Sequence, residues 1–592
     1  MNKIKAITLI TLLPFMLLCT AYANTIVVGN QSDFDNLKSK ILKGINAGEK
    51  EIYVSFVRGT YVFKDNHIVL SRLKAADTRV HFIGNGAVLI PEGCKYYSGD
   101  IYEGEFKYDN SWMEKGADNT IWTQMRYADN LIELVEPGTK LCRLKNDLFK
   151  GCSYEKGSAY IHITHWFQSS IYKIEKIKSG YVYFKAPDLG RSSLDGKGYN
   201  LNDDYYFYKS FPRFRLCNVD TGEDVLKINE GKVVLPSGCH VVYEGKSPRF
   251  LTIQVSTLAS FDIKDFVFYG NSYQASTSYM YFYEVKAKAI GIENCVFAGL
   301  HGNPISIVNT DNVSVYRNKF TDCYYGGILS DNMSANTSVV NNTFENMGLR
   351  IQNTFAVTCR GTNYYIADNS FENYGAGGIS VGDWSHNPHE RPSSGVVENN
   401  VLTYLPDYLI WVEKNGLMDS GAIYVWTKND GAIIRNNVIK NYSGAGGNKG
   451  IFCDNGSYGV SIIGNLVTGV KNSFSITARR VANVEETKSA GTGIVASNIN
   501  NIIKDNIIDG SLFFAGHERM DNGCEYGVNY LLVPEGAASP RVTVSNVTET
   551  GEDVLLEIKG EKKDRIAINR TGYRSVKKVL GCKTTRRMFV RQ

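Results

Sequence analysis

Short apolar runs recur in pairs between about residues 245 and 535, and each pair surrounds a polar residue followed by an asparagine. Two clear copies are Val340-Asn341-Asn342-Thr343-Phe344 and Ile434-Arg435-Asn436-Asn437-Val438-Ile439. The repeat asparagines are Asn294, Asn318, Asn342, Asn369, Asn400, Asn437, Asn465 and Asn506. Their spacings of 24, 24, 27, 31, 37, 28 and 41 residues indicate a unit of about two dozen residues that carries insertions of variable length.

This pattern predicts an all-β solenoid. Parallel strands cannot be joined by a two-residue hairpin, so repeated strand, corner and strand without a helical pattern predict coils stacked along an axis. We expect the repeat asparagine at the corner, because it tolerates left-handed backbone angles and its amide can bond to the neighbouring coil. The pattern resembles the right-handed parallel β-helix of pectate-lyase-like carbohydrate enzymes, and the resemblance covers roughly residues 245–535.

The flanking segments carry other patterns. Residues 34–45 predict an amphipathic helix with apolar positions 34, 37, 41, 42 and 45, which resembles the N-terminal cap of such solenoids. Residues 95–235 lack the asparagine repeat and contain alternating runs such as Tyr160–Trp166, so we expect an inserted antiparallel β domain. The predicted divisions are a signal peptide (1–23), a cap with the first solenoid strands (24–94), the inserted domain (95–235), the β-helix (236–535), and closing strands with a basic tail (536–592).

The N-terminus is typical of an exported protein. An apolar run, Ile7–Leu18, leads to Ala21-Tyr22-Ala23, a cleavage pattern that places the mature start near Asn24. We therefore expect a periplasmic or extracellular protein. An outer-surface lipoprotein acylated at Cys19 is the alternative, although a bulky leucine precedes that cysteine. No later stretch reaches the 18 apolar residues of a membrane span.

Charge and cysteine content exclude several classes. The net charge of +5 is small for 592 residues and the basic side chains are scattered, so nucleic acid is not expected as a partner. Twelve cysteines, eleven after signal removal, show no CxxC spacing, and no histidines are paired at zinc-ligand distances, which argues against structural zinc. No bound metal is expected unless the protein is a lyase that uses calcium. Four cysteines lie in repeat units, where buried free thiols are expected: Cys295, Cys323, Cys359 and Cys453.

A second set of strands precedes the asparagine corners and places candidate chemistry on one sheet. If the isoleucines of these strands (Ile328, Ile379, Ile423 and Ile451) face inward, period-two alternation turns Leu329, Ser380, Tyr424 and Phe452 outward, followed by Asp331, Gly382, Trp426 and Asp454. We therefore expect carboxylates and aromatic rings on one exposed face. Carboxylates one or two coils apart can fall at the roughly 5 to 10 Å separation that glycoside hydrolysis uses.

Two segments of this sheet resemble a bacterial β-helix group that includes glycoside hydrolase family 141. Residues 418–424 match its Asp-x-Gly-Ala-Ile-Tyr stretch, and residues 450–459 resemble its Ile-Tyr-x-Asp-Asp-Gly stretch, with Phe452 and Asn455 as departures. The resemblance implies that Asp419 and Asp454 are the catalytic carboxylates. The predicted substrate contacts are Asp383, Trp384, His386, His389, Tyr424, Trp426 and Arg360. Three further aspartates, Asp331, Asp430 and Asp505, are expected to form turns.

Three functions follow from these features. The first is a secreted glycoside hydrolase that acts on a polysaccharide or oligosaccharide, as a monomer and without a cofactor. The second is a polysaccharide lyase with an arginine base, for which Arg360, Arg479 and Arg480 are available, and with calcium to neutralise a uronate. The third is a non-catalytic glycan-binding surface protein. The fold alone does not choose among them, because unrelated activities share it.

Overall fold

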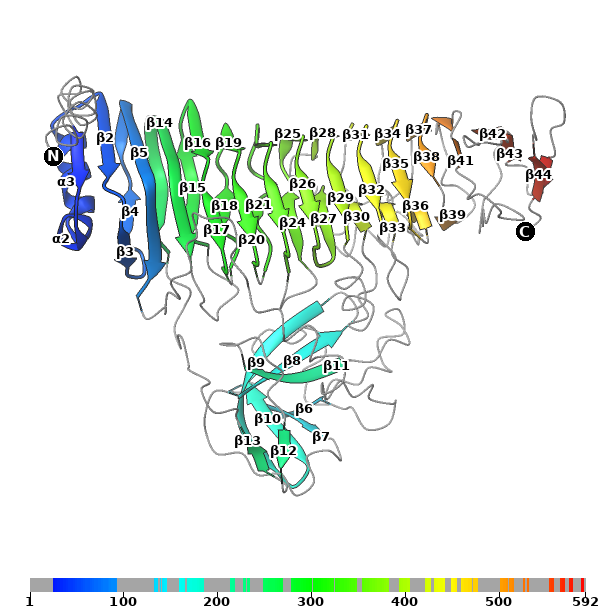
Figure 1. Ribbon diagram of the computed structural model, residues 1–592, viewed down its shortest axis with the longest axis horizontal. Helices are drawn as coiled ribbons and strands as arrows, with labels where there is room; N and C mark the ends of the chain where they lie inside the picture. Colours follow the sequence, from blue (N-terminus) through cyan, green and yellow to red (C-terminus); the bar gives the residue numbers. More distant parts are fainter. Residues whose placement is uncertain are drawn as a thin grey trace, which may run out of the picture.

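The computed structural model describes residues 25–92, most of 249–508, and strands within 132–234 and 511–589. The longest gaps within 249–508 are residues 383–392, 405–420 and 478–500. Figure 1 shows a long solenoid with two helices at its N-terminal end and a small antiparallel sheet at its C-terminal end. The predicted parallel β-helix, with an N-terminal helical cap and an inserted antiparallel sheet, is confirmed.

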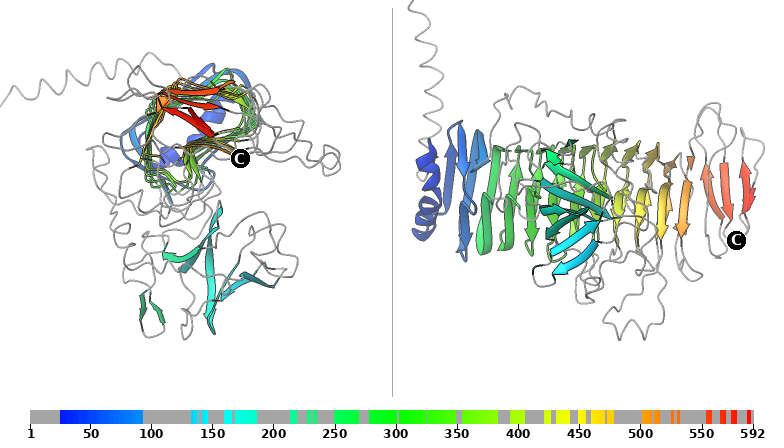
Figure 2. Two further views of the ribbon diagram at one scale, coloured as in Figure 1. Left: turned by 90° about the vertical axis from the view of Figure 1, so that its right-hand side faces the viewer. Right: turned by 90° about the horizontal axis from the view of Figure 1, so that it is seen from below.

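The solenoid has three parallel faces, which we name sheets I, II and III. Each complete coil contributes one short strand to every face, and successive coils superimpose when viewed along the axis (Figure 2). Two long strands, β5 (Lys74–Pro91) and β14 (Leu251–Tyr269), run around the corners, and β14 contributes to all three faces. The inward side chains of the three faces form one continuous apolar core.

The remaining strands are assigned to the faces as follows. Sheet I contains β4 (Ile68–Ser71), β15 (Met280–Lys286), β18 (Ile305–Val308), β21 (Ile328–Ser330), β24 (Phe355–Cys359), β27 (Gly377–Val381), β30 (Gly421–Val425), β33 (Lys449–Cys453), β36 (Asn472–Thr477) and β39 (Ser511–Ala515). Sheet II contains β1 (Thr25–Val28), β2 (Glu51–Phe56), β16 (Ala289–Glu293), β19 (Val313–Tyr316), β22 (Ser338–Val340), β25 (Thr362–Ala367), β28 (Ser394–Glu398), β31 (Ile433–Arg435), β34 (Ser461–Ile463), β37 (Ile502–Lys504) and β40 (Glu525–Tyr526). Sheet III contains β3 (Thr60–Phe63), β17 (Val296–Ala298), β20 (Lys319–Thr321), β23 (Thr343–Glu345), β26 (Ser370–Glu372), β29 (Val401–Thr403), β32 (Val438–Lys440), β35 (Leu466–Thr468), β38 (Ile507–Ile508) and β41 (Tyr530–Leu531).

The predicted cap helix is two helices, α2 (Gln31–Asp35) and α3 (Leu37–Asn46). They meet at Asn36, whose backbone leaves the helical region and whose amide bonds to the carbonyl of Ser32. The apolar stripe of the prediction still faces the solenoid, because Phe34, Leu37 and Ile41 are fully buried against the first coils.

Antiparallel strands lie between β5 and β14 in the sequence and outside the solenoid in space (Figures 1 and 2). Six strands form one sheet in the order β11-β8-β9-β10-β7-β6. Their bounds are β6 (Ile132–Glu136), β7 (Leu141–Lys145), β8 (Ala159–His165), β9 (Gln168–Lys178), β10 (Tyr181–Lys185) and β11 (Arg213–Asn218), and a hairpin of β12 (Lys227–Asn229) and β13 (Lys232–Val234) follows. The C-terminal sheet contains β42 (Asp553–Glu557), β43 (Arg565–Asn569), β44 (Arg574–Lys578) and β45 (Arg587–Phe589). Residues 541–544, which belong to the predicted closing segment, lie outside the described residues.

Seven buried asparagines form a continuous ladder at the corner between sheets II and III. They are Asn318, Asn342, Asn369, Asn400, Asn437, Asn465 and Asn506, and each is at most 2% exposed. The side-chain amide nitrogen of each donates to the side-chain oxygen of the next at 2.9–3.1 Å, and its backbone N–H donates to the same oxygen. The amide's second hydrogen bonds to a strand carbonyl of the preceding coil, as in Asn342 to Val315. Every buried polar group of the ladder thus finds a partner.

The left-handed backbone was predicted at the repeat asparagine, and this is wrong for the ladder residues. The left-handed residue is the one before, as at Arg317, Asp368 and Asn399 (φ 53°, 55° and 55°). That turn aims the following side chain into the corner instead of into solvent. In the first copy Asn294 is itself left-handed (φ 51°), so Cys295 occupies the ladder position and its N–H donates to Asn318.

Core side chains also repeat from coil to coil. Behind sheet III, five phenylalanine rings stack nearly parallel, with centroids 4.7–5.0 Å apart: Phe268, Phe297, Phe320, Phe344 and Phe371. Cys295, Cys323 and Cys359 are free thiols and buried, as predicted, and Cys453 is buried as well. Burial raises the pKa of the Cys295 and Cys359 thiols to about 12, so they remain protonated and act as small apolar groups.

Replacing a ladder residue should destabilise the fold strongly. In Asn400→Ala, the buried backbone N–H and amide nitrogen of Asn369 lose their common acceptor, so the free energy of unfolding should fall by about 3 kcal/mol. Guanidinium unfolding of the purified protein measures this loss. The matched control is Asn399→Gly, because Asn399 is exposed and glycine accepts its left-handed backbone. Equal losses in both variants would contradict a special role for the ladder.

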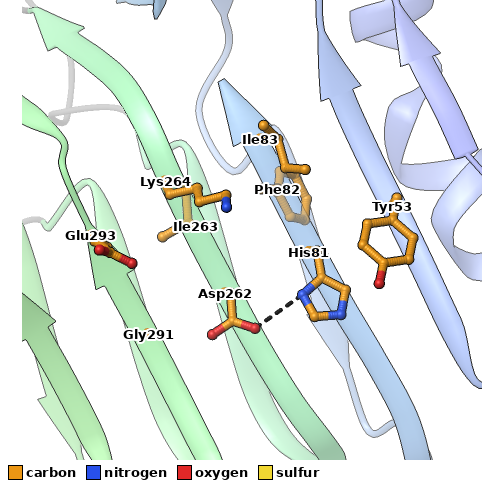
Figure 3. A pocket seen from close by; sticks show the side chains of 9 residues that line it. All are labelled: Tyr53, His81, Phe82, Ile83, Asp262, Ile263, Lys264, Gly291 and Glu293. Atoms are coloured by element: carbon orange, nitrogen blue, oxygen red, sulfur yellow. Dashed lines mark ion pairs between the residues drawn. The ribbon is translucent and has the colours of Figure 1, made fainter. Parts of the chain in front are cut away.

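One ionic group joins three successive coils on the outer side of sheet II, and we call it the His81 strut. The imidazole of His81 (β5) bonds through Nε2 to Glu51 (β2) at 2.9 Å and through Nδ1 to Asp262 (β14) at 3.0 Å. Figure 3 shows the Asp262 contact, with Tyr53 stacked beside the imidazole. Arg79 pairs with the same Glu51 at 2.8 Å. The strut therefore ties β14 to β5 across the inserted segment.

The strut should make stability depend on pH. The hydrogen bond to Asp262 raises the pKa of His81 against the opposing effect of burial, and Glu51 raises it further. A raised pKa means that the contribution is complete below the unfolded value of about 6.5 and is lost as pH rises through the folded value. Thermal unfolding of wild type and His81→Gln at pH 5 and pH 8 should show the larger difference at pH 5. A difference that grows toward pH 8 would contradict this assignment.

Candidate functional site

The ends of five adjacent strands of sheet I align several predicted site residues in one row. Strand register pairs Ser330, Cys359, Val381, Val425 and Cys453 in succession. The next residues along are therefore also neighbours: Asp331, Arg360, Gly382, Trp426 and Asp454. Backbone bonds continue past the strand ends, from Arg360 to Ser330, from Trp426 to Val381 and from Asp454 to Val425. Strand register thus places a carboxylate, an indole and a guanidinium along one edge of sheet I.

Asp454 is the buried carboxylate of this row, with 7% of its surface exposed. The hydroxyl of Tyr424, on the neighbouring strand β30, donates a short hydrogen bond to its Oδ2. A buried carboxylate needs such donors, because leaving water costs a charged group far more than a neutral one. Tyr424 therefore fixes the direction of one carboxylate oxygen of Asp454.

Aromatic rings surround the Tyr424–Asp454 pair. The ring of Tyr424 lies 4.8 Å from Trp426, 5.0 Å from Phe452 and 5.4 Å from Phe355, measured between centroids. Phe355 reaches this position because Gly377 has no side chain; a Cβ there would lie 2.6 Å from the Phe355 ring. We call Phe355, Tyr424, Trp426 and Phe452 the aromatic cluster.

Polar contacts hold the cluster on both sides. The indole N–H of Trp426 donates to the hydroxyl of Ser380 at 2.8 Å. The ammonium of Lys449 lies 3.5 Å from the Phe452 ring centroid, a cation–π contact. Sequence alternation did not single out Phe355 or Lys449, because both depend on how neighbouring coils pack and not on the period within one strand.

The predicted exposure of this face is wrong at Asp454, which is buried, and at three strand residues. Ile379, Ile423 and Ile451 face the core as expected, but Ser380, Tyr424 and Phe452 on the opposite side are only 1%, 2% and 1% exposed. The rings of the cluster cover one another, and the indole of Trp426 covers Ser380. Trp426 and Phe355 are partly exposed, so solvent reaches the cluster at these two rings.

Five predicted site residues lie outside the described residues: Asp419, Asp383, Trp384, His386 and His389. Their roles stay predictions. Asp430 lies outside them as well, whereas the two other predicted turn formers are described. The carboxylate of Asp331 accepts bonds from the N–H groups of Asn309 and Met333, and Asp505 has a left-handed backbone with φ of 58°, so both form turns as predicted.

Arg360 lies three strands from Asp454 along the row, about 14 Å at the usual strand spacing. It is half-buried and close to Tyr325. Burial raises the pKa of the Tyr325 phenol, and the charge of Arg360 opposes that rise. Arg360 therefore shares the face with Asp454 without contacting it.

Two further findings bound the chemistry. Within the described part of the chain, no group of three or more His, Cys, Asp or Glu side chains is arranged to hold a metal ion. No helix among those residues is long and apolar enough to cross a membrane. The arrangement around Asp454 offers a directed carboxylate, an indole edge and an ammonium, which suits an uncharged, hydroxyl-rich ligand better than an anion.

Comparison with known families identifies the fold class. Residues 252–439 match the family described as "Right handed beta helix region". The solenoid is therefore a right-handed parallel β-helix, and the match covers the coils that carry the first five ladder asparagines. No curated protein matches the chain in sequence.

Several solved structures are similar to the chain over most of its length. One titled "Glycoside hydrolase" is 10% identical, with 85% of this chain and 97% of that chain covered and a TM-score of 0.31. The complex of XylC with xylose is 10% identical, with 92% and 89% covered and a TM-score of 0.34. The Gp54 tailspike of Acinetobacter baumannii bacteriophage AP22, in complex with a capsular saccharide, is 8% identical, with 88% and 77% covered and a TM-score of 0.18. At these values the function has to be inferred from the site residues themselves.

The Tyr424–Asp454 bond should contribute measurably to stability. Tyr424→Phe removes a donor from a buried carboxylate, so unfolding by guanidinium should require about 2 kcal/mol less free energy. Tyr365→Phe is the matched control, because its hydroxyl bonds to Glu398 at 2.7 Å but its side chain is 39% exposed. That loss should stay below about 1 kcal/mol. The assignment fails if the two variants lose the same amount.

Proposed function

We propose that the protein is a secreted glycoside hydrolase that acts on a complex polysaccharide or oligosaccharide. The observation that carries the proposal is the buried carboxylate of Asp454, held by the Tyr424 hydroxyl inside an aromatic cluster on the outer face of sheet I. Glycoside hydrolysis requires two carboxyl groups, and aromatic rings bind the apolar faces of sugars. Trp426 is partly exposed and lies in the same row as Asp454, so it is the ring placed to contact a sugar.

In this proposal Asp454 acts as one carboxylate of the pair. One group donates a proton to the leaving oxygen, and the other activates water or attacks the sugar. Because the tyrosine hydroxyl donates to Oδ2, the hydrogen bond uses Asp454 as an acceptor, which favours Asp454 as the base or nucleophile. The acid is then the second carboxylate.

Asp419 remains the proposed second carboxylate, and its place in the chain limits how close it can come to Asp454. Asp419 precedes Gly421, the first residue of β30, by two residues, which span at most about 7 Å. Asp454 follows the opposite end of the neighbouring strand β33. The pair reaches a hydrolytic separation only if the chain before β30 turns back across sheet I. Asp383, which directly follows Gly382 in the site row, competes for the role.

The outer face of sheet I offers a path for an extended glycan. From Tyr424 the strand register continues through Ser380, Thr358, Leu329 and Ser306 to Tyr281. Thr358, Leu329 and Tyr281 are the partly exposed members of this row. These five steps span about 24 Å. Arg249 lies 4.3 Å from the Tyr281 ring centroid, so the row ends in a second aromatic platform. We expect the glycan to lie along the solenoid axis, with Trp426 and Tyr281 near opposite ends.

A polysaccharide lyase is the second candidate, because Arg360 lies in the site row. A lyase would use a basic side chain and produce an unsaturated sugar that absorbs ultraviolet light. Its arginine would lie about 14 Å from the Tyr424–Asp454 pair, outside the distance over which one sugar contacts both. This separation favours the hydrolase. A glycan-binding surface protein would bind the same glycans without turnover.

Product analysis tests the proposal. Wild type and Asp454→Asn are incubated with a panel of neutral and uronate-containing glycans, with and without calcium, and both reducing ends and ultraviolet absorbance are measured. Wild type should release reducing ends without absorbance, and Asp454→Asn should be slower by at least about 100-fold. Asp505→Asn, a substitution at an exposed turn, is the control and should keep full activity.

Other outcomes decide against the hydrolase. An absorbing product that depends on calcium would identify a lyase, and binding without any product would identify a surface protein. Asp419→Asn and Asp383→Asn, assayed in parallel, distinguish the two candidates for the second carboxylate, because the true partner should lose as much activity as Asp454→Asn.

A further inference from the structure

A pocket of about 170 Å³ opens beside the His81 strut, on the outer face of sheet II near the N-terminal end. Figure 3 shows its walls: Tyr53 and His81 on one side, Lys264 and Glu293 on the other, and Asp262 between them. The volume corresponds to about five or six water molecules. It therefore suits one sugar-sized molecule or one unit of a longer chain.

Gly291 forms the floor of this pocket. Its strand, β16, pairs with β14 so that Gly291 lies directly beside Asp262. A Cβ at this position would lie 2.6 Å from Oδ1 of Asp262. Glycine thus leaves Oδ1 accessible from the pocket, while Oδ2 is taken by His81.

The strut itself leaves no ring nitrogen for a ligand. Both nitrogens of His81 bond to carboxylates, which only accept hydrogen bonds, so this geometry fits the protonated imidazole that the raised pKa favours. It serves as a fixed positive charge between two negative ones and cannot exchange a proton with a bound molecule at the same time. The pocket is accordingly suited to binding and not to acid–base catalysis.

Three polar groups remain available around Gly291. Oδ1 of Asp262 and the carboxylate of Glu293 are acceptors, and the ammonium of Lys264 is a donor. Lys264 and Glu293 are both exposed and in register on adjacent strands, yet neither has an ion-pair partner within the described chain. Charges balance: Glu51 and Asp262 offset Arg79 and protonated His81, and Glu293 offsets Lys264. A neutral ligand with several hydroxyl groups matches a pocket of zero net charge with both acceptors and a donor.

We propose that this pocket binds a neutral sugar unit, at a site separate from Asp454 on a different face of the solenoid. The hydroxyls of the sugar donate to Asp262 and Glu293 and accept from Lys264, and Tyr53 provides the aromatic wall. A uronate is disfavoured because it adds a negative charge next to two carboxylates. The site would hold the protein on a glycan while the face with Asp454 acts on another segment.

Binding measurements in the Asp454→Asn background test this inference independently of any hydrolysis. Methyl β-glucoside and methyl β-xyloside are titrated by calorimetry and saturation-transfer NMR, with galacturonate and calcium chloride as the charged probes. A neutral glycoside should bind, and the double variant Lys264→Ala/Glu293→Ala should weaken binding at least tenfold. Lys288→Ala, at an exposed lysine outside the pocket, is the matched control and should bind like the parent.

The unfolding midpoint of each variant shows whether its fold is intact. The proposal is overturned if neither glycoside binds, if the double variant binds as tightly as the parent, or if galacturonate or calcium binds in place of the neutral glycosides. Because the parent is already Asp454→Asn, failure here leaves the hydrolase proposal untouched, and absence of hydrolysis leaves this one untouched. Gly291→Ser, which fills the floor beside Asp262, should abolish binding in a protein that keeps Lys264 and Glu293.

Discussion

The hydrogen-bonded ladder of buried asparagines is the constraint on which the rest of the solenoid depends. A parallel strand two or three residues long has few backbone bonds, and a slip of one residue would exchange its inner and outer side chains. In each coil the ladder asparagine bonds to the coil before and the coil after, as Asn400 does with Ile366 and Asn437. Because the amide can bond to both neighbouring coils in only one position, each ladder asparagine fixes the register of sheets II and III in its own coil. The stacked phenylalanines follow from the same register.

Fixing one corner leaves the others free to vary. The ladder spacing changes from 24 to 41 residues without any break in the amide bonds, so the additional residues lie in the turns elsewhere in the coil. Insertions of this kind flank sheet I, where β27, β30 and β33 carry the candidate site. Chemistry can therefore be placed at the variable corners, while the invariant corner supplies the stability that a buried carboxylate such as Asp454 requires.

Much of the fold was predictable from the sequence because it repeats. The asparagine pattern identified the coils, and alternation placed Ile379, Ile423 and Ile451 in the core. Alternation gives the direction of a side chain and not what covers it, so it missed the burial of Tyr424 and Phe452. The left-handed residue was predicted one position too late for a similar reason. Asparagine is favoured both at the left-handed position and at the ladder position after it, and only the backbone conformation distinguishes the two.

The parts that escaped prediction depend on contacts between distant segments. His81 and Asp262 are 181 residues apart and are separated in the sequence by the antiparallel insertion, so no local pattern indicates that their strands are neighbours. The asparagine repeat also begins only at Asn294, which follows both β5 and β14 in the sequence. It therefore gives no indication that these two strands pair. The site on sheet I had a local signal, because Asp454 directly follows a repeat strand. Its partner Tyr424 comes from the coil before, at the position that strand register assigns to it.

On the outer faces of sheets I and II, strand register determines which residues lie beside an aspartate. On sheet I, register brings Tyr424 beside β33, the strand that Asp454 directly follows, and on sheet II it brings Asp262 between His81 and Gly291. In both places a side chain of the preceding coil donates a hydrogen bond to one oxygen of the aspartate. The two sites differ in the space that is left around that aspartate. Aromatic rings enclose the first carboxylate, which suits a reacting group, whereas glycine leaves the second open to a small pocket, which suits binding. In the two proposals, the same repeated backbone supports two different uses of an aspartate, and single residues of the adjacent coil distinguish them.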